Sequence, residues 1–225
     1  MSEPVERRFT QEFPRYYDLY VPEGDGPFPL VIAMHGYGGD KSSMMRLARR
    51  ISETRYAIAA LQGPHQHVVY PESREQALKY AFGWASNYRF DESLALHRDA
   101  IETVLRDVAH DPRIESDRTF LLAFSQAVAF NFRVALADPG RVRGVVGICG
   151  GVPGDLATNA DYSRGEFDVL MVGGATDEFY DPERMRANCA ALEPFVRSVE
   201  VRIFECGHVV PRDVHPIIDE WMAER

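Results

Sequence analysis

The 225-residue sequence has few cysteines and no excess of positive charge. Its three cysteines, Cys149, Cys189 and Cys206, are an odd number without metal-ligand spacing. This argues against a disulfide framework and favours reduced thiols. The 34 acidic residues outnumber the 25 basic ones, and the net charge of −9 is spread along the chain. Nucleic acid is therefore not expected as the main partner.

Long apolar runs are also missing from the sequence. No stretch is long enough to cross a bilayer, and residues 1–15 are charged and lack the apolar region of a secretory signal. These features predict a cytoplasmic protein. A chain of this length can bury one good core, so we expect a single domain over residues 1–225. The sequence indicates no particular oligomeric state.

Segments of strand character and segments of helical character alternate along the chain. Apolar runs at residues 28–34, 56–61, 119–124, 144–149 and 167–172 are typical of strands buried on both faces of a parallel sheet. The alternation predicts a three-layer α/β fold with a mostly parallel sheet. Residues 65–90 lack this regularity, and we expect them to form a long loop that serves as a lid or wall.

One apolar run ends at Ser125, and a second apolar segment with helical character follows it. A strand that enters a helix through one serine is the arrangement of a nucleophile elbow. The usual pattern is G-x-S-x-G, but Ala123 and Ala127 stand at the glycine positions. Glycine is favoured there because strand and helix approach closely, and a methyl group is the smallest addition. The alternative is that Ser125 is an ordinary turn residue.

Other predicted strand-end loops carry the groups that such a serine needs. Asp177 and His208 follow Ser125 in the chain order Ser, Asp, His, which is the order of α/β-hydrolases. His208 would accept the serine proton, and Asp177 would orient the imidazole. The backbone N–H groups of Tyr37 and Gln126 would bind the oxyanion. Because ligands bind outside the carboxyl ends of the strands, these groups are expected to meet at one edge of the sheet.

Each of these residues also has a non-catalytic interpretation. Asp177 could cap the following helix, although Asp181 is better placed to do so, and His208 could be an ordinary loop histidine. Cys149 and Cys206 also lie at predicted strand ends, but neither has the context of an elbow. The occurrence of serine, aspartate and histidine at strand ends, in this order, favours the catalytic interpretation.

The sequence resembles the phospholipase/carboxylesterase family of the α/β-hydrolases, which includes bacterial carboxylesterases and acyl-protein thioesterases. The resemblance extends over residues 30–221 and rests on residues 34–39 (MHGYGG), 117–126 (DRTFLLAFSQ), 174–177 (GATD) and 207–211 (GHVVP). It implies Ser125, Asp177 and His208 as a catalytic triad and the backbone of Tyr37 and Gln126 as an oxyanion hole. The chain departs from the family at both elbow glycines, and it has Cys149 where a serine before glycine is common.

We therefore expect a serine carboxylesterase that hydrolyses short-to-medium acyl esters through an acyl-enzyme intermediate, without a cofactor or a metal ion. The expected partner is a small-molecule ester. Trp84, Phe179 and Val209 are the predicted substrate-binding residues, and Tyr37 and Phe130 are further candidates for the pocket wall, although Phe130 could belong to the core. The alternatives are a thioesterase or lysophospholipase with the same triad, and a non-catalytic ligand-binding member of the fold.

Overall fold

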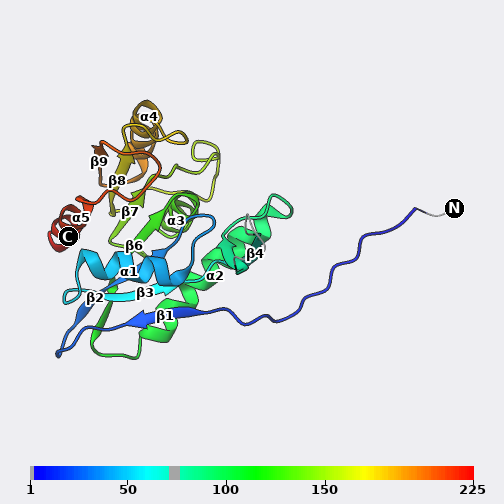
Figure 1. Ribbon diagram of the computed structural model, residues 1–225, viewed down its shortest axis with the longest axis horizontal. Helices are drawn as coiled ribbons and strands as arrows, with labels where there is room; N and C mark the ends of the chain where they lie inside the picture. Colours follow the sequence, from blue (N-terminus) through cyan, green and yellow to red (C-terminus); the bar gives the residue numbers. More distant parts are fainter. Residues whose placement is uncertain (1–2, 71–76) are drawn as a thin grey trace.

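The computed structural model describes residues 3–70 and 77–225, which form a central sheet flanked by helices (Figure 1). The strands are β1 (Tyr17–Tyr20), β2 (Phe28–Met34), β3 (Ala57–Leu61), β4 (His65–Val69), β5 (Lys79–Gly83), β6 (Ile114–Phe124), β7 (Gly144–Ile148), β8 (Asp168–Gly174) and β9 (Ser198–Phe204). The α-helices are α1 (Lys41–Ile51), α2 (Phe90–Val108), α3 (Gln126–Ala137), α4 (Pro182–Leu192) and α5 (Val214–Ala223), and a 3₁₀ turn spans Glu193–Phe195.

The central sheet has seven strands in the order β1-β3-β2-β6-β7-β8-β9. Strand β1 pairs antiparallel with β3, and the remaining pairs of neighbours are parallel. The prediction of a mostly parallel sheet is therefore confirmed. Because the parallel strands point the same way, the loops that follow β2, β6, β8 and β9 reach the same edge of the sheet.

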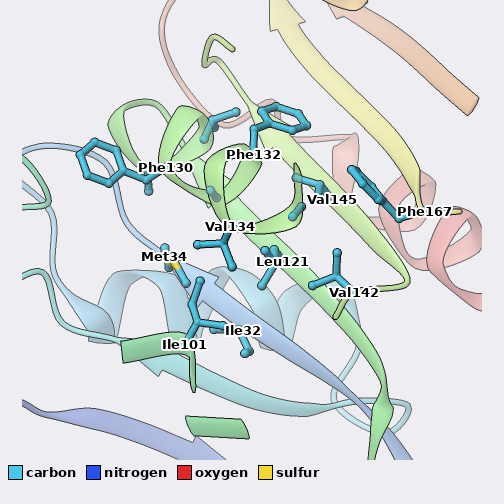
Figure 2. Close-up of a cluster of buried hydrophobic side chains, with 14 of the residues drawn as sticks. Ile32, Met34, Ile101, Leu121, Phe130, Phe132, Val134, Val142, Val145 and Phe167 are labelled. Carbon is cyan, nitrogen blue, oxygen red and sulfur yellow. The ribbon is translucent and has the colours of Figure 1, made fainter. Parts of the chain in front are cut away.

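Helices cover both faces of the sheet, because alternate residues of each strand are buried on opposite sides. On β2, Leu30 and Ile32 belong to one core cluster together with residues of α2, α3 and α4. Val31 and Ala33 belong to the other cluster, with residues of α1 and α5. Figure 2 shows the first cluster, in which Ile101 lies near the sheet side chains Ile32 and Leu121. These layers explain the continuous apolar runs, since neither face of the strands meets water.

Two helices begin with aspartate caps at the edge where the candidate residues lie. Asp40 accepts a hydrogen bond of 2.7 Å from the Ser43 N–H at the start of α1. Ser43 is the third helical residue and completes a capping box with Asp40. At the start of α4, Asp181 accepts from the Arg184 N–H at 2.8 Å. An aspartate at this position typically contributes about 1 kcal/mol to helix stability.

Two parts of the chain differ from the sequence prediction. Residues 65–90 are not one irregular loop, because β4 and β5 pair antiparallel from His65↔Gly83 to Val69↔Lys79. The sequence does not indicate this sheet, because its two short strands alternate only weakly between polar and apolar residues. Residues 71–76 lie outside the described residues. Strand β6 begins at Ile114, ahead of the apolar run at residues 119–124 that predicted it, and its pairing with β2 shifts between Pro29 and Leu30.

All three cysteines carry free thiols, in agreement with the odd number in the sequence. Within residues 3–70 and 77–225, none of the helices combines the length and the apolar character that crossing a membrane requires.

Candidate active site

Ser125 lies between the end of β6 and the start of α3 in an unusual backbone conformation. Its φ is 53° and its ψ is −115°, a region that residues with a side chain rarely occupy. The Ser125 N–H donates to the Ile148 carbonyl of β7 at 2.8 Å, which fixes the turn to the neighbouring strand. The turn thus has the sharp strand-to-helix geometry of a nucleophile elbow.

The alanines at the usual glycine positions are accommodated in this turn. Ala123 and Ala127 are both fully buried. Helix α3 also comes close to two glycines in and after β7. A Cβ at Gly147 would lie 2.7 Å from Val128 Cγ1, and a Cβ at Gly150 would lie 2.4 Å from Val128 Cβ. Glycine at these two positions therefore leaves the room that α3 requires.

The structure brings Ser125, Asp177 and His208 together from three different loops. His208 Nε2 lies 2.8 Å from Ser125 Oγ, and His208 Nδ1 lies 2.9 Å from Asp177 Oδ2. Since a carboxylate can only accept, Nδ1 carries the proton in this arrangement, and Nε2 is free to accept from the hydroxyl. The geometry is that of an activated serine with an oriented base.

Asp177 is buried, and several donors surround its carboxylate. Burial alone would raise its pKa, but the hydrogen bonds from the Tyr180 N–H, from His208 and from the Phe179 N–H outweigh it and hold the pKa of Asp177 below its usual value. The two backbone donors lie 3.0 Å (Tyr180) and 2.8 Å (Phe179) from Oδ1. The carboxylate therefore stays ionised and keeps Oδ2 for the imidazole.

Three aromatic rings surround the His208 imidazole. Ring centroids lie 5.1 Å away for Phe124, 4.9 Å for Phe179 and 6.3 Å for Tyr180. Two of these rings follow Asp177 in the same loop, and the third precedes Ser125. The imidazole therefore lies among aromatic side chains, with its two nitrogens directed at Ser125 and Asp177.

The glycine loop after β2 places Tyr37 next to the elbow. Its backbone is held from two sides: Gly39 N–H donates to the Gly36 carbonyl at 3.1 Å, Gly38 N–H donates to the Phe82 carbonyl at 2.9 Å, and Phe82 N–H donates to the Gly39 carbonyl at 3.2 Å. Gln126 is the first residue of α3, where a backbone N–H has no acceptor within the helix. The loop and the helix start are the two segments expected to supply oxyanion donors.

Trp84 was expected in the wall of the substrate pocket, but the structure places it elsewhere. Its side chain is fully buried, so the indole does not face a bound substrate. The indole Nε1–H donates to the His35 carbonyl at 2.7 Å, and the Trp84 backbone N–H donates to Gln126 Oε1 at 2.7 Å. Trp84 thus links the glycine loop to the first residue of α3.

His35 is a buried structural residue of the glycine loop. Its Nε2 accepts from the Gly63 N–H at 3.0 Å, and its Nδ1 lies 2.7 Å from the Gly36 carbonyl. Burial lowers its pKa, although the Gly36 hydrogen bond and the charge of Asp40 oppose this shift. His35 is therefore neutral, with its proton on Nδ1.

The other predicted substrate residues lie in two different environments. Phe179 and Val209 are exposed by 55% and 53%, beside Asp177 and His208 in sequence, and Tyr37 is exposed by 66%. The Tyr37 ring stacks on His67 of β4, with centroids 4.8 Å apart. Phe130 is only 4% exposed and belongs to the core, as its second interpretation allowed.

A cavity of about 270 Å³ lies beside the glycine loop. Its lining is mostly apolar and includes Tyr37, Met44, Leu47, Phe124 and Val210. The cavity is slightly smaller than the usual range for ligand pockets, which is about 300–1,000 Å³.

Cys149 lies behind the imidazole, at the end of β7. It is fully buried and has a positive φ of 48°, and its Sγ donates to the Val209 carbonyl at 3.4 Å. Burial, together with the negative charge of Asp177, raises the pKa of the thiol to about 12. The thiol is therefore protonated and is not an activated nucleophile.

Sequence reasoning missed Phe82 and Tyr180, which hold the site through their backbone groups. Any residue type can supply such groups, so no side-chain pattern could have identified them.

Comparison with known proteins finds a match to the phospholipase/carboxylesterase family model over residues 21–223. The structure is similar to that of a carboxylesterase from Mesorhizobium loti, with a TM-score of 0.72, 22% identity, and coverage of 94% of this chain and 95% of that one. A carboxylesterase from Bacillus cereus matches with a TM-score of 0.71 and 14% identity, over 93% of this chain and 94% of the Bacillus chain.

The structure of a phospholipase/carboxylesterase from Dyadobacter fermentans is also similar, with a TM-score of 0.66 and 17% identity. The match covers 95% of this chain and 99% of the Dyadobacter chain. At these identities the likeness of the solved structures establishes the α/β-hydrolase fold. A search of curated protein sequences finds no significant match.

Proposed function

The chain belongs to the phospholipase/carboxylesterase family of α/β-hydrolases, and on this premise we propose that it is a serine carboxylesterase with Ser125, His208 and Asp177 as its catalytic triad. We further propose that it acts on small-molecule esters with short-to-medium acyl groups, and that residues 1–225 form a single domain. The cytoplasmic location expected from the sequence stays a prediction.

In the first half of the reaction, Ser125 Oγ attacks the ester carbonyl while His208 Nε2 takes the hydroxyl proton. The separation of 2.8 Å between these atoms lies within the range for direct proton transfer. The tetrahedral intermediate carries its negative charge on the former carbonyl oxygen. The Tyr37 and Gln126 N–H groups stabilise this oxygen, and His208 then gives its proton to the departing alcohol.

In the second half, water attacks the acyl-enzyme ester and His208 again acts as base, then returns the proton to Ser125. During both halves the imidazole is transiently charged. Asp177 stabilises that charge because it is ionised, buried and 2.9 Å from Nδ1. Its two backbone donors keep it from turning away.

The observation that carries this proposal is the continuous pair of contacts from Asp177 through His208 to Ser125. The structural histidine His35 pairs with backbone groups of Gly36 and Gly63, whereas His208 pairs with a carboxylate and a hydroxyl. Here both ring nitrogens are engaged, and the serine stands in a strained conformation. Strained backbone of this kind is concentrated at functional sites.

Two features support short-to-medium acyl groups. The cavity of about 270 Å³ beside the glycine loop is mostly apolar and small. Phe179 and Val209 offer further exposed apolar surface beside His208. A pocket of this kind favours uncharged acyl chains of limited length.

A fluorophosphonate probe tests the nucleophile directly. We expect one adduct per chain, which mass spectrometry locates on Ser125. Labelling should disappear in Ser125→Ala and weaken strongly in His208→Ala. An adduct on Cys149 or Cys206 would show that the nucleophile is misassigned. No adduct on the folded protein would favour a non-catalytic ligand-binding role.

Substrate class requires a second measurement, because a thioesterase or lysophospholipase would use the same triad. We expect kcat/KM to be higher for p-nitrophenyl esters with short-to-medium acyl chains than for matched thioesters or lysophospholipids. Faster hydrolysis of the thioester with the same acyl group would replace the carboxylesterase assignment.

A further inference from the structure

The side chains of Cys149, Asp177 and His208, which carry three different donor atoms, lie close together. One ligand atom each of Cys149, Asp177 and His208 lies within 4.8 Å of the other two. Cys149 and Asp177 are buried, and His208 is partly buried. A thiol sulfur, a carboxylate oxygen and an imidazole nitrogen are the ligand types that bind Zn²⁺.

We propose that Cys149, Asp177 and His208 form an inhibitory site for Zn²⁺ and other thiophilic divalent cations. The inhibitory effect rests on the proposed catalytic role of His208, whereas binding of the ion does not. The site depends on Cys149, which adds a soft ligand beside the Asp–His pair.

The charges of the three groups suit a divalent cation. Upon binding, Cys149 Sγ releases its proton to solvent, and its hydrogen bond to the Val209 carbonyl is given up. A thiolate and the Asp177 carboxylate then neutralise the two positive charges, and the imidazole stays neutral. This balance matters because a buried uncompensated charge is strongly unfavourable.

The distances require only a local adjustment. Tetrahedral zinc with a Zn–S distance of about 2.3 Å and a Zn–N distance of about 2.0 Å needs sulfur and nitrogen about 3.5 Å apart. The three ligand atoms lie within 4.8 Å of one another, so small shifts of the side chains are enough to reach this separation. A water molecule would complete the coordination, since three protein ligands leave one position open.

Binding at this site would remove the base of the proposed mechanism. Nδ1 is the nitrogen that faces Asp177, and Nε2 faces Ser125. An ion coordinated by Nδ1 takes that lone pair, so the imidazole proton must move to Nε2. The protonated Nε2 can donate to Ser125 Oγ but cannot accept its proton, so acylation stops.

Cadmium provides a probe of binding that is independent of activity. Titration of the intact protein with Cd²⁺ should produce one ultraviolet cadmium–thiolate charge-transfer band per chain, and Zn²⁺ should displace it. Zn²⁺ should also lower p-nitrophenyl ester hydrolysis at least tenfold at saturation, with recovery after chelation. Mg²⁺ should do neither, because it prefers oxygen ligands.

Cys149→Ser tests the assignment, and Cys206→Ser is its matched control. The serine can still donate to the Val209 carbonyl, but its hydroxyl is a poor ligand for soft metals. We expect Cys149→Ser to lose both the band and the sensitivity to Zn²⁺, relative to its own metal-free rate, and Cys206→Ser to keep both.

Three results would overturn the metal site: no band in the unmodified protein, a band that depends on Cys206 instead, or inhibition that persists in Cys149→Ser. If the protein hydrolyses no ester, the proposed function fails, and the cadmium band still decides whether the ion binds.

Discussion

The two sides of the candidate site are supported in different ways. Ser125, Asp177 and His208 stand on loops that directly follow strands of the central sheet, and their partners are mostly one another and their own loops. The glycine loop with Tyr37 instead depends on the β4–β5 hairpin, which belongs to a separate sheet. We refer to residues 79–84, with their contacts to the glycine loop and to Gln126, as the hairpin support.

The difference separates chemistry from positioning. In the proposed mechanism Ser125 and His208 exchange a proton and Asp177 stabilises the charged imidazole, so removing any one of them impairs a step of the reaction. The hairpin support would exchange no proton, but it sets the distance between the two expected oxyanion donors through Trp84, which bonds both His35 and Gln126. Changes in the support should therefore reduce the rate to a limited extent, whereas changes in the triad should nearly eliminate it.

The largest effect is expected for the triad itself. Ser125→Ala and His208→Ala should each lower kcat by about 10⁴-fold or more, because nucleophile and base act as a unit. The double variant should be no worse than either single one, and near-ultraviolet circular dichroism should show an intact fold. Normal turnover in His208→Ala would remove that residue from the mechanism, and the triad would then not differ from the hairpin support in its effect on the rate.

A smaller loss is expected when the hairpin support is cut from the elbow. Gln126→Met keeps the length of the side chain but removes the oxygen that accepts from the Trp84 N–H. We expect kcat to fall by about 10- to 100-fold with little change in KM, below the loss of an entire oxyanion donor at about 10²–10³-fold. Gln66→Met, at an exposed position of β4, is the matched control and should behave like the unmodified protein.

Trp84→Phe examines the same support from its other end. The variant loses the indole N–H that donates to the His35 carbonyl, so kcat should fall while the order of preference among acyl lengths stays the same. A changed order of preference would return Trp84 to the pocket wall and contradict its supporting role.

Lowering the pH should affect the stability of the two regions differently. On the side of the hairpin support, His97 packs on Trp84 with ring centroids 5.0 Å apart. Burial lowers the pKa of His97 to about 3, although its hydrogen bond to Asn131 opposes the shift. In the unfolded chain His97 binds a proton near pH 6.5, whereas in the folded protein it does so only near pH 3. The contribution of neutral, buried His97 to the free energy of unfolding is therefore complete above pH 6.5 and is lost as pH falls toward 3. The free energy of unfolding should drop by up to about 1.4 kcal/mol per pH unit in this window.

Asp177 behaves differently, because its pKa lies below its usual value of 3.8 in the folded protein. The contribution of ionised Asp177 to the free energy of unfolding is complete above pH 3.8 and is lost only as pH falls through the lower pKa of the folded protein. Denaturation curves between pH 7 and pH 5 should therefore report on the buried histidines. His97→Gln should reduce the slope, and His35, with its own lowered pKa, should account for part of the remainder. An unchanged slope would place the titrating group elsewhere.

The same division explains what could be predicted from the sequence. The parallel sheet follows from apolar runs such as that of β2, whose two faces are both covered. Ser125, Asp177 and His208 are recognisable because each follows a strand in a fixed order, so topology alone brings them to one edge. Asp181 was likewise identifiable as a helix cap from its position before Pro182.

The hairpin support could not be predicted in this way. The exposed strand β4 has no apolar face to reveal it, and Phe82 acts through its peptide groups. The large apolar side chain of Trp84 suggested a substrate contact, but it is buried, and both of its hydrogen bonds go to residues more than 40 positions away. Such contacts arise from tertiary packing and leave no local pattern.

The smallest effect is expected at Phe179, which belongs to the triad side but takes part in no step. Its ring meets the His208 imidazole edge-on and is 55% exposed. A substrate chain that covers about 40 Å² of this ring gains about 1 kcal/mol, at about 25 cal/mol per Å². Phe179→Ala should therefore raise KM about fivefold for the longer esters and leave kcat and stability nearly unchanged.

Leu19→Ala, at a 44% exposed position on β1, is the matched control and should change neither constant. The split between KM and kcat decides what the ring does. A lower kcat with unchanged KM would mean that Phe179 acts by holding the imidazole, since ground-state binding would then be intact. Positioning would in that case be needed on both sides of the site, by side-chain packing around His208 and by backbone pairing around Tyr37.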